Sequence, residues 1–378
     1  MRIGFYSCMS GVAWGGSEEL WWRAARELQT AGHEVVVNYK WWPEPARQLR
    51  ELIEHGGRIY YRNQPPTYWQ NKFSFARNLF GHRNGTPQSW LDEYRPDAVL
   101  ITIGYHPDRI EVADYCLQNN IPYAINVQCA SNFFFISGQV LDAYRGWYQN
   151  AKRVFFVSPE NQHKIETNLA ASLAHNAEIV CNPFNIDVDN IPGYPEVEDG
   201  MFRLACVGRI HFQSKGQDLI IDVLRQPKWR ERNLLVTMYG GDQGNRRQLE
   251  DLIKMHGLES KIQIAGFVDG VNRIWAENHG LLLPSRYEGA PLCVIEAMMC
   301  NRICITTDTG RNRELMDDSV SGFIAAGAMV DLLDDAMERA WNMRHEWKQM
   351  GELAGQHVRQ RYSTRPVTDF AEKLKRLV

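Results

Sequence analysis

The chain has 378 residues, of which 44% are hydrophobic and 23% charged, and its formal charge at pH 7 is -3. This length is enough for two domains with separate cores, and the composition is that of an ordinary soluble globular protein. The small negative charge argues against a non-specific nucleic-acid-binding protein, and no apolar run reaches the ~18–20 residues needed to span a bilayer. The eight cysteines are scattered without a C-x-x-C pair, which indicates reduced thiols, no metal site and a cytoplasmic location.

Short apolar runs alternate with amphipathic stretches of helical length, which predicts parallel sheets with crossover helices. The strands expected in the first half are residues 2–7, 34–39, 58–61, 98–103, 123–127 and 153–157. A passage rich in Pro, Gly and acidic residues then predicts an interdomain linker, and the pattern restarts at residue 202. The expected division is therefore an N-terminal domain at 1–182, a linker at 183–200 and a C-terminal domain at 201–364.

The loop after the first strand contains Gly15 and Gly16 and leads into a helix expected at 17–31. The G-x-G-x-x-G fingerprint is absent, and Asn38 and Tyr39 stand where a dinucleotide-binding domain has an acidic residue. These features argue against a nicotinamide-dependent oxidoreductase. A flexible turn followed by a helix cap at Ser17 is the purely structural interpretation of the loop.

Aromatic residues are concentrated in the first third of the chain. Most of them are expected to pack in the core, but flat rings also stack on sugars, and Trp14 is a candidate for such a contact. Residues 66–84 interleave aromatic and basic side chains, with Trp69, Phe73 and Phe80 on one helical face. This helix either packs on its own domain beside an acceptor site or lies on an anionic membrane surface.

Two polar side chains follow later strands of the first half. His106 comes after the strand at 98–103, and Gln128 comes directly after the strand at 123–127. A lone histidine is commonly structural, whereas a glutamine can hydrogen-bond to a hydroxyl but cannot take a proton. Both residues are candidates for contacts with a sugar or an acceptor.

The second half contains a pair of cations near a strand end. Arg209 and Lys215 bracket a loop that follows the strand at 202–207 and leads into a helix. Two fixed cations facing a diphosphate would neutralise the charge that develops as it leaves. The alternative is that both are ordinary surface cations.

A strand, a turn and a helix are expected from residue 280 to residue 299. Pro291 suits the first position of the helix, and the N–H groups around it favour a phosphate. Glu288 and Glu296 flank this anion site, where carboxylates suit the hydroxyl groups of a sugar or ribose. The alternative is that Glu288 caps the helix and Glu296 is a solvated surface residue.

Two of these motifs resemble those of family-four retaining glycosyltransferases, which have the GT-B fold. Residues 288–296 are similar to the family's E-x7-E element, and residues 208–216 match its G-R-x5-K-G. Residues 301–304, Asn-Arg-Ile-Cys, depart from the family's usual Gly-x-Pro-Val. The resemblance implies an α/β fold with two doubly wound Rossmann-like domains facing each other across a cleft, and a C-terminal helix at 365–378 that returns to the first domain.

The resemblance also implies an activity, a retaining transfer of a hexose from a nucleoside-diphosphate sugar to a hydroxyl of a saccharide or lipid-linked glycan. UDP is the nucleotide expected in the donor, with GDP as the next candidate, and no metal cofactor is expected. Arg209, Lys215 and Glu288 would be the catalytic residues, and Glu296 would hold the ribose. The donor-binding residues that it implies are Gly15, Gly16, Gly208, Arg209, Lys215, Gly240, Gly241, Phe267, Glu288, Gly289, Ala290, Pro291, Leu292 and Glu296.

Many relatives carry a histidine at the position of Gln128, so a general base is not expected in this chain. Front-side attack, in which the leaving phosphate takes the acceptor proton, is consistent with a glutamine there. Two other functions stay open, a nucleotide-sugar epimerase on the same scaffold and a non-catalytic protein that binds sugar nucleotides or glycans. The expected location is the cytoplasm, with residues 66–84 as a candidate contact with the inner face of the membrane.

Overall fold

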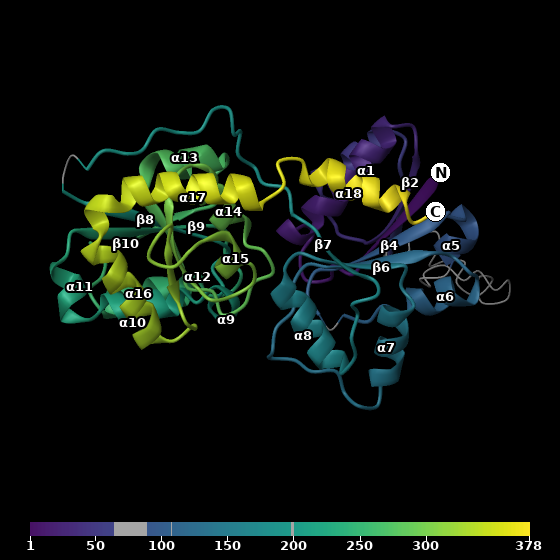
Figure 1. Cartoon of the computed structure of the whole chain (residues 1–378), viewed down its shortest axis with the longest axis horizontal. Helices are drawn as coiled ribbons and strands as arrows, with labels where there is room; N and C mark the ends of the chain where they lie inside the picture. The colour runs from purple at the N-terminus through teal and green to yellow at the C-terminus, as the bar shows by residue number, and fades with distance from the viewer. Residues whose placement is uncertain (64–88, 107, 198–199) are drawn as a thin grey trace. The chain divides into compact units, whose positions relative to one another are not determined.

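The computed structural model describes residues 1–63, 89–106, 108–197 and 200–378 (Figure 1). The chain divides into two compact units, Met1–Pro183 with Arg365–Val378, and Phe184–Thr364. The helix predicted at 66–84 lies outside the described residues. In the part of the chain that is described, no helix is both long and apolar enough to cross a membrane.

The first unit contains a seven-stranded parallel sheet in the order β3-β2-β1-β4-β5-β6-β7. Its strands are β1 Arg2–Ser7, β2 Glu34–Lys40, β3 Arg58–Arg62, β4 Ala98–Ile103, β5 Tyr123–Val127, β6 Arg153–Phe156 and β7 Ala177–Ile179. Its helices are α1 Glu19–Thr30, α2 Arg47–Glu54, α5 Ser89–Tyr94, α6 Val112–Gln118, α7 Leu141–Gln149, α8 Pro159–Leu169 and α18 Pro366–Lys375. The strands predicted from the apolar runs are confirmed to within one residue at each end.

Helices cover both faces of this sheet, because successive residues of a strand point to opposite sides. On one face α1 and α18 lie side by side (Figure 1). The ring of Phe155 in β6 meets that of Phe370 in α18 there, with 5.2 Å between centroids. Val154 and Phe156, the strand neighbours of Phe155, belong to the core on the opposite face with side chains of α5, α6, α7 and α8.

The second unit contains a six-stranded parallel sheet in the order β10-β9-β8-β11-β12-β13. Its strands are β8 Phe202–Val207, β9 Leu234–Tyr239, β10 Ile262–Gly266, β11 Gly280–Leu283, β12 Ile303–Thr307 and β13 Phe323–Ala325. Its helices are α9 Phe212–Lys215, α10 Gln217–Leu224, α11 Pro227–Glu231, α12 Arg246–Met255, α13 Val271–Glu277, α14 Leu292–Met299, α15 Asn312–Leu315, α16 Val330–Asn342 and α17 Trp347–Arg361. Apolar side chains of α10, α12 and α16 form its core with β8, β9 and β12.

The segment after Pro183 packs on the second unit, whereas residues 183–200 were predicted to be a linker between the domains. Arg302 is 1% exposed and donates to the carbonyl of Gly193 at 2.5 Å and to that of Asn278 at 2.9 Å. Its guanidinium also lies over the ring of Tyr194 at 5.1 Å. A buried guanidinium needs acceptors for its five N–H groups, and this segment supplies some of them.

Asn301, which stands where the resembled family usually has a glycine, keeps the backbone conformation that a glycine would allow. Asn301 has a φ of +59°, a left-handed conformation that asparagine tolerates better than most residues. Its side-chain oxygen accepts a hydrogen bond from Arg359 of α17 at 3.2 Å. A Cβ on Gly351 would lie 2.2 Å from the carbonyl oxygen of Asn301, so α17 can approach this turn only because it has a glycine there.

Candidate functional site

Loops at the carboxyl ends of β8, β9 and β10 meet in the second unit, since parallel strands end at the same edge of a sheet. The N–H of Gly208 donates to the carbonyl of Tyr239 at 2.8 Å, and the N–H of Gly240 donates to that of Gly266 at 2.8 Å. These bonds join the three loops side by side. Ligands of open α/β sheets bind at such an edge, outside the carboxyl ends of the strands.

Glycines are required at two positions of this edge. Gly240 has a φ of 143°, and a Cβ there would lie 2.1 Å from the carbonyl oxygen of Gly208. Gly216 has a φ of 67°, and its Cβ would lie 2.2 Å from the carbonyl oxygen of Pro284, directly after β11. Gly241, by contrast, has open space where a Cβ would stand.

Lys215 and Glu288 form an ion pair at this edge. Nζ of Lys215 lies 2.5 Å from Oε1 of Glu288, which also accepts a hydrogen bond from Oγ of Ser285 at 2.7 Å. The aliphatic part of the lysine side chain lies 3.4 Å from the position of a Cβ on Gly208. Burial is the largest single influence on the pKa of Lys215 and lowers it, but the charges of Glu288 and Cys293 and the hydrogen bond with Glu288 together raise it by more, so the net shift is upward and the ammonium stays protonated.

Arg209 adds a second cation near the lysine. Its side chain is exposed and makes no hydrogen bond or ion pair with the residues that the structure describes. Burial, followed by the charges of Arg209 and Lys215, lowers the pKa of His211. Nδ1 of His211 lies 2.7 Å from Oγ of Ser214, so the neutral ring is held by α9.

The interpretation of both cations as ordinary surface residues is wrong for Lys215, because its side chain is only 17% exposed.

Glu296 is buried in α14, with 3% of its surface exposed. Its Oε1 accepts hydrogen bonds from the backbone N–H and the side-chain amide of Asn185, at 3.0 and 3.1 Å. The alternative of a solvated surface residue is therefore wrong for Glu296. A carboxylate in this position is oriented by the chain segment that follows Pro183.

The start of α14 differs by one position from the prediction. The helix begins at Leu292, and Pro291 is its N-cap, because its ψ of 113° is extended rather than helical. No side chain caps the helix, so the alternative role of Glu288 as a cap is also wrong. The N–H groups of Gly289, Ala290 and Leu292 donate to no atom of the described residues, which leaves them available to an anion.

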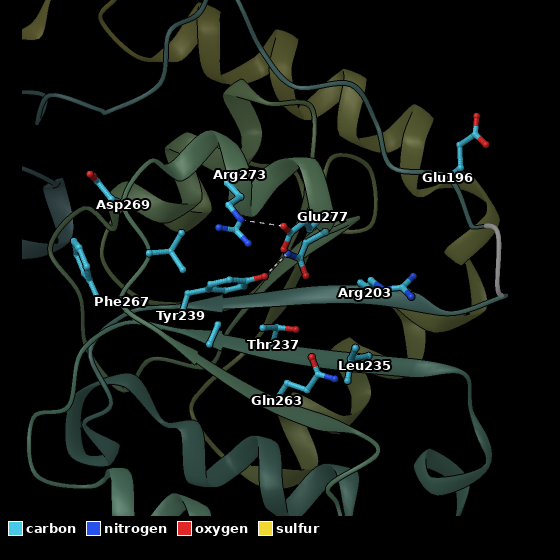
Figure 2. Close-up of a pocket in the computed structure, with 13 residues that line it drawn as sticks. Glu196, Arg203, Leu235, Thr237, Tyr239, Gln263, Phe267, Asp269, Arg273 and Glu277 are labelled. Atoms are coloured by element: carbon cyan, nitrogen blue, oxygen red, sulfur yellow. Dashed lines mark hydrogen bonds and ion pairs between the residues drawn. The ribbon is translucent and has the colours of Figure 1, made fainter.

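A hollow with a volume of about 930 Å³ lies on the face of β8, β9 and β10. Figure 2 shows the residues that line it. Tyr239 forms part of its floor, and its hydroxyl accepts a hydrogen bond from Asn278 at 3.0 Å. Phe267, one of the expected donor-binding residues, stands at one end of the hollow and is 81% exposed. Neither Lys215 nor Glu288 lines the hollow, so it is distinct from the ion pair.

In the first unit, Trp14 belongs to an aromatic cluster. Its ring lies 5.8 Å from that of Trp21 and 6.0 Å from that of Tyr39, and its indole N–H donates to Glu19 at 2.8 Å. The predicted packing role is confirmed. The contact with a sugar stays a prediction.

Gly15 and Gly16 precede α1, but Ser17 does not cap the helix as predicted. A 3₁₀ turn, Gly16–Glu18, comes first, and Glu18 occupies the N-cap position of α1 without a capping hydrogen bond. A Cβ on Gly16 would meet no atom within 4 Å, so packing does not require glycine there. Space above Gly16 is compatible with the approach of a ligand.

Glu18 is a buried carboxyl that the sequence interpretation missed. It is 0% exposed, and its Oε2 accepts hydrogen bonds from Ser7 at 2.6 Å and from the indole of Trp21 at 2.9 Å. Burial raises the pKa of Glu18 from 4.5 to about 7, although these hydrogen bonds oppose the shift. An acidic residue directly after a Gly-Gly-Ser turn was the available signal.

His106 and Gln128 are both buried in the first unit. Nδ1 of His106 lies 3.2 Å from the hydroxyl of Tyr148, and burial lowers the pKa of His106 to about 4, which favours the structural interpretation. The side-chain amide of Gln128 donates to Asn126 at 2.7 Å, and its oxygen accepts from Asn182 at 2.9 Å. Both ends of Gln128 are therefore engaged within the protein.

Groups of three or more His, Cys, Asp or Glu side chains that could hold a metal ion do not occur among the described residues. All eight cysteines lie within the described ranges and are free thiols.

Residues 202–343 match the family model of group 1 glycosyl transferases. The α-D-kanosaminyltransferase of Streptomyces kanamyceticus is 27% identical over 159 residues, which are 42% of this chain and 41% of that protein. An uncharacterised glycosyltransferase of Methanocaldococcus jannaschii is 26% identical over 270 residues, which are 61% of this chain and 63% of that protein. The chain thus matches less than two thirds of the length of these relatives.

Among solved structures, Anabaena HepE in complex with UDP and glucose aligns with a TM-score of 0.72. The alignment covers 100% of both chains at 16% sequence identity. The likeness extends over both units and shows the predicted fold class, that of the GT-B glycosyltransferases.

Proposed function

We propose that this chain is a retaining glycosyltransferase that takes a hexose from a nucleoside-diphosphate sugar, with UDP as the expected nucleotide and no metal cofactor. The observation that carries the proposal is the ion pair of Lys215 and Glu288, with the exposed Arg209 nearby, at the carboxyl edge of the second sheet. These residues lie within the range that matches group 1 glycosyl transferases.

The diphosphate of the donor would bind beside Lys215 and Arg209. Lys215, at the end of α9, is held by Glu288, and Arg209 lies in the loop that follows β8, so both cations can stabilise charge on the leaving phosphate. The unpaired N–H groups of Gly289, Ala290 and Leu292 at the start of α14 provide further donors. With these positive groups in place, the site does not need a divalent metal for charge neutralisation.

The two carboxylates would bind hydroxyl groups. Glu288, held by Lys215 and Ser285, is assigned to the transferred sugar, and Glu296, oriented by Asn185, to the ribose. The exposed ring of Phe267 would lie beside the base. The turn at Gly240 and Gly241 would lie beside the nucleotide. The aliphatic part of the Lys215 side chain packs over Gly208.

The reaction would proceed by front-side attack. The acceptor hydroxyl oxygen forms a bond with the anomeric carbon as the bond from that carbon to the phosphate oxygen breaks, and the leaving phosphate takes the hydroxyl proton. The configuration at the anomeric carbon is then retained. Gln128 cannot take a proton, and both ends of its amide are engaged, so the scheme assigns it no role as a base.

The N-terminal domain at 1–182, with the helix at 365–378, is assigned to the acceptor, and the domain at 201–364 to the donor. Gly15, Gly16 and Trp14 are the candidate contacts with donor phosphate and acceptor on that side. The acceptor class is a saccharide or a lipid-linked glycan. A cytoplasmic location and a membrane contact through residues 66–84 stay predictions.

The test is sugar transfer from a panel of donors, UDP-glucose, UDP-galactose, UDP-N-acetylglucosamine and GDP-mannose, to a mixture of saccharide and lipid-linked acceptors. Nucleotide release and the mass of the glycosylated product are measured for the wild type and for Lys215→Ala. Lys254→Ala, which removes an exposed cation of α12, is the matched control. A donor converted to its epimer without transfer would favour the epimerase, and donor binding without turnover would favour a binding protein.

A further inference from the structure

Arg286, in the loop that follows β11, is bonded to the segment that carries Lys215. Its Nη1 and Nη2 donate to the two carboxylate oxygens of Asp218 at 2.8 and 2.6 Å. Nη1 also donates to the carbonyl of Phe212 at 2.5 Å, and the backbone N–H of Arg286 donates to the carbonyl of Ser214 at 2.8 Å. The loop after β11 is therefore tied to the lysine segment at three residues.

These three residues lie on both sides of Lys215 in sequence. Two of them belong to α9, which ends at Lys215, and the third, Asp218, lies in the first turn of α10. Glu288, the partner of Lys215, follows Arg286 by two residues. Because the bonds of Arg286 join its own loop to the lysine segment, they fix the separation between the lysine ammonium and the glutamate carboxylate.

The contact between Arg286 and Asp218 is suited to holding a geometry. The two side chains are 25% and 29% exposed, and two parallel N–H to oxygen bonds fix their relative orientation. A lysine in place of Arg286 would carry the same charge, but it would lack the planar fork that makes both bonds. The carboxylate also neutralises the guanidinium, which makes Arg286 a weaker ligand for phosphate than the exposed Arg209.

We propose that Arg286 and Asp218 are positioning residues, which hold Lys215 and Glu288 at the spacing that cleavage of the donor requires. They act through these two residues and not on the donor itself. The inference rests on the proposed function, because it concerns the same transfer. Its magnitude follows from geometry, since a displacement of about 1 Å in a catalytic group can lower a rate about 10²-fold.

The first experiment compares the kcat of Arg286→Ala, Asp218→Ala and the double variant. We expect a loss of roughly 10- to 100-fold in each single variant and no further loss in the double variant, since either substitution ends the same contact. An arginine that bound the donor phosphate directly would stay in place in Asp218→Ala. Wild-type kcat in Asp218→Ala, or in Arg286→Lys, would therefore overturn the proposal.

Arg232 and Glu338 form a matched control pair in the same unit. Arg232 donates to the two carboxylate oxygens of Glu338 at 2.9 and 2.6 Å, and the side chains are 17% and 30% exposed. Arg232 precedes β9, so this pair lies at the amino end of that strand. Arg232→Ala should lower the melting temperature at least as much as Arg286→Ala but keep kcat. An equal loss of kcat in both variants would assign the effect to destabilisation and overturn the proposal.

The second experiment needs no donor and measures the acetylation rate of Lys215 by acetic anhydride at pH 8, with Lys254 as the internal reference. Only the neutral amine reacts, and Glu288 favours the ammonium form of Lys215. Arg286→Ala should loosen this ion pair and raise the acetylation rate of Lys215 at least about threefold. An unchanged rate would overturn the proposal. Asp218→Asn, which keeps the shape of the side chain, takes the place of Arg286→Ala if that variant does not fold.

Lys215→Ala separates failure of this inference from failure of the proposed function. If Lys215→Ala loses activity while Arg286→Ala keeps both the kcat and the acetylation rate of the wild type, the positioning role alone is wrong. Full activity of Lys215→Ala would overturn the proposed function and, with it, the positioning role.

Discussion

Nζ of Lys215 and Oε1 of Glu288, 73 positions apart in sequence, lie 2.5 Å apart at the end of the second sheet. Neither side chain is more than 17% exposed, so water screens the pair only in part. The fold brings them together through the turn at Gly216, which packs directly on Pro284. A cation and a carboxylate are thus aligned before any ligand arrives.

Lys215→Ala and Arg209→Ala should each lower kcat by about 10²-fold or more, because each removes a cation that stabilises the leaving diphosphate. Steady-state kinetics with the donor that the panel selects measure the effect, and Lys254→Ala is the control for loss of one surface charge. Full activity in either variant would remove that residue from the catalytic set.

Glu296→Ala should weaken UDP binding by at least about tenfold, since it removes the acceptor for the ribose hydroxyls. Glu288→Ala should leave UDP affinity nearly unchanged but lower turnover, because UDP has no sugar for Glu288 to bind. Isothermal titration with UDP and kinetics with the complete donor separate the two roles. Equal UDP affinity in the wild type and Glu296→Ala would refute the ribose assignment.

Glu18 should make stability fall as pH rises. With a pKa raised from 4.5 to about 7, the folded protein binds more protons than the unfolded chain between these values, so the free energy of unfolding decreases from pH ~4.5 to pH ~7 and is flat above. The expected decrease in the free energy of unfolding is on the order of 3 kcal/mol, and Glu18→Gln should remove it.

Thermal unfolding of the wild type and Glu18→Gln between pH 4.5 and 8 checks this dependence. Asp142→Asn, whose side chain is 96% exposed, is the matched control. Parallel pH profiles for Glu18→Gln and the wild type would show that folding does not raise the pKa of Glu18.

Gly240→Ala should destabilise the protein by about 3 kcal/mol or more, because alanine meets both an unfavourable φ and the carbonyl of Gly208. Gly241→Ala, at the adjacent position, has open space and should change the melting temperature little. Differential scanning calorimetry of the two variants measures the contrast. Similar melting temperatures would show that the turn relaxes to admit a side chain.

Apolar runs predicted the sheets well, because strands buried on both faces read as continuous hydrophobic segments. The strand at Phe202–Val207 forms as expected, whereas β7, Ala177–Ile179, was missed since three residues with a central Glu178 carry no such signal. The start of α14 was misplaced by one residue. Proline fixes φ but leaves ψ free, so the sequence could not distinguish an N-cap from a first helical residue.

The candidate site was predicted as a list of residues rather than as a set of contacts. Motif spacing indicated Glu288 and Lys215 as site residues. Their ion pair could not be predicted, because it joins two segments that lie far apart in the sequence. Glu296 accepts hydrogen bonds from Asn185, which the sequence analysis placed in the interdomain linker. Glu18 directly follows a Gly-Gly-Ser turn, but its burial was missed because it depends on contacts with Ser7 and Trp21 that the local sequence does not show.

The measurement that tests the central claim most directly is thermal unfolding with UDP, GDP, ADP and NAD, each with and without EDTA, on the wild type and Lys215→Ala. A ligand at ~100 times its dissociation constant stabilises the folded state by about 2.7 kcal/mol. We predict that UDP raises the melting temperature of the wild type, that EDTA does not abolish the shift, and that Lys215→Ala reduces it. A wild type that no nucleotide stabilises, or a shift that is the same in Lys215→Ala, would contradict a donor site at the ion pair of Lys215 and Glu288.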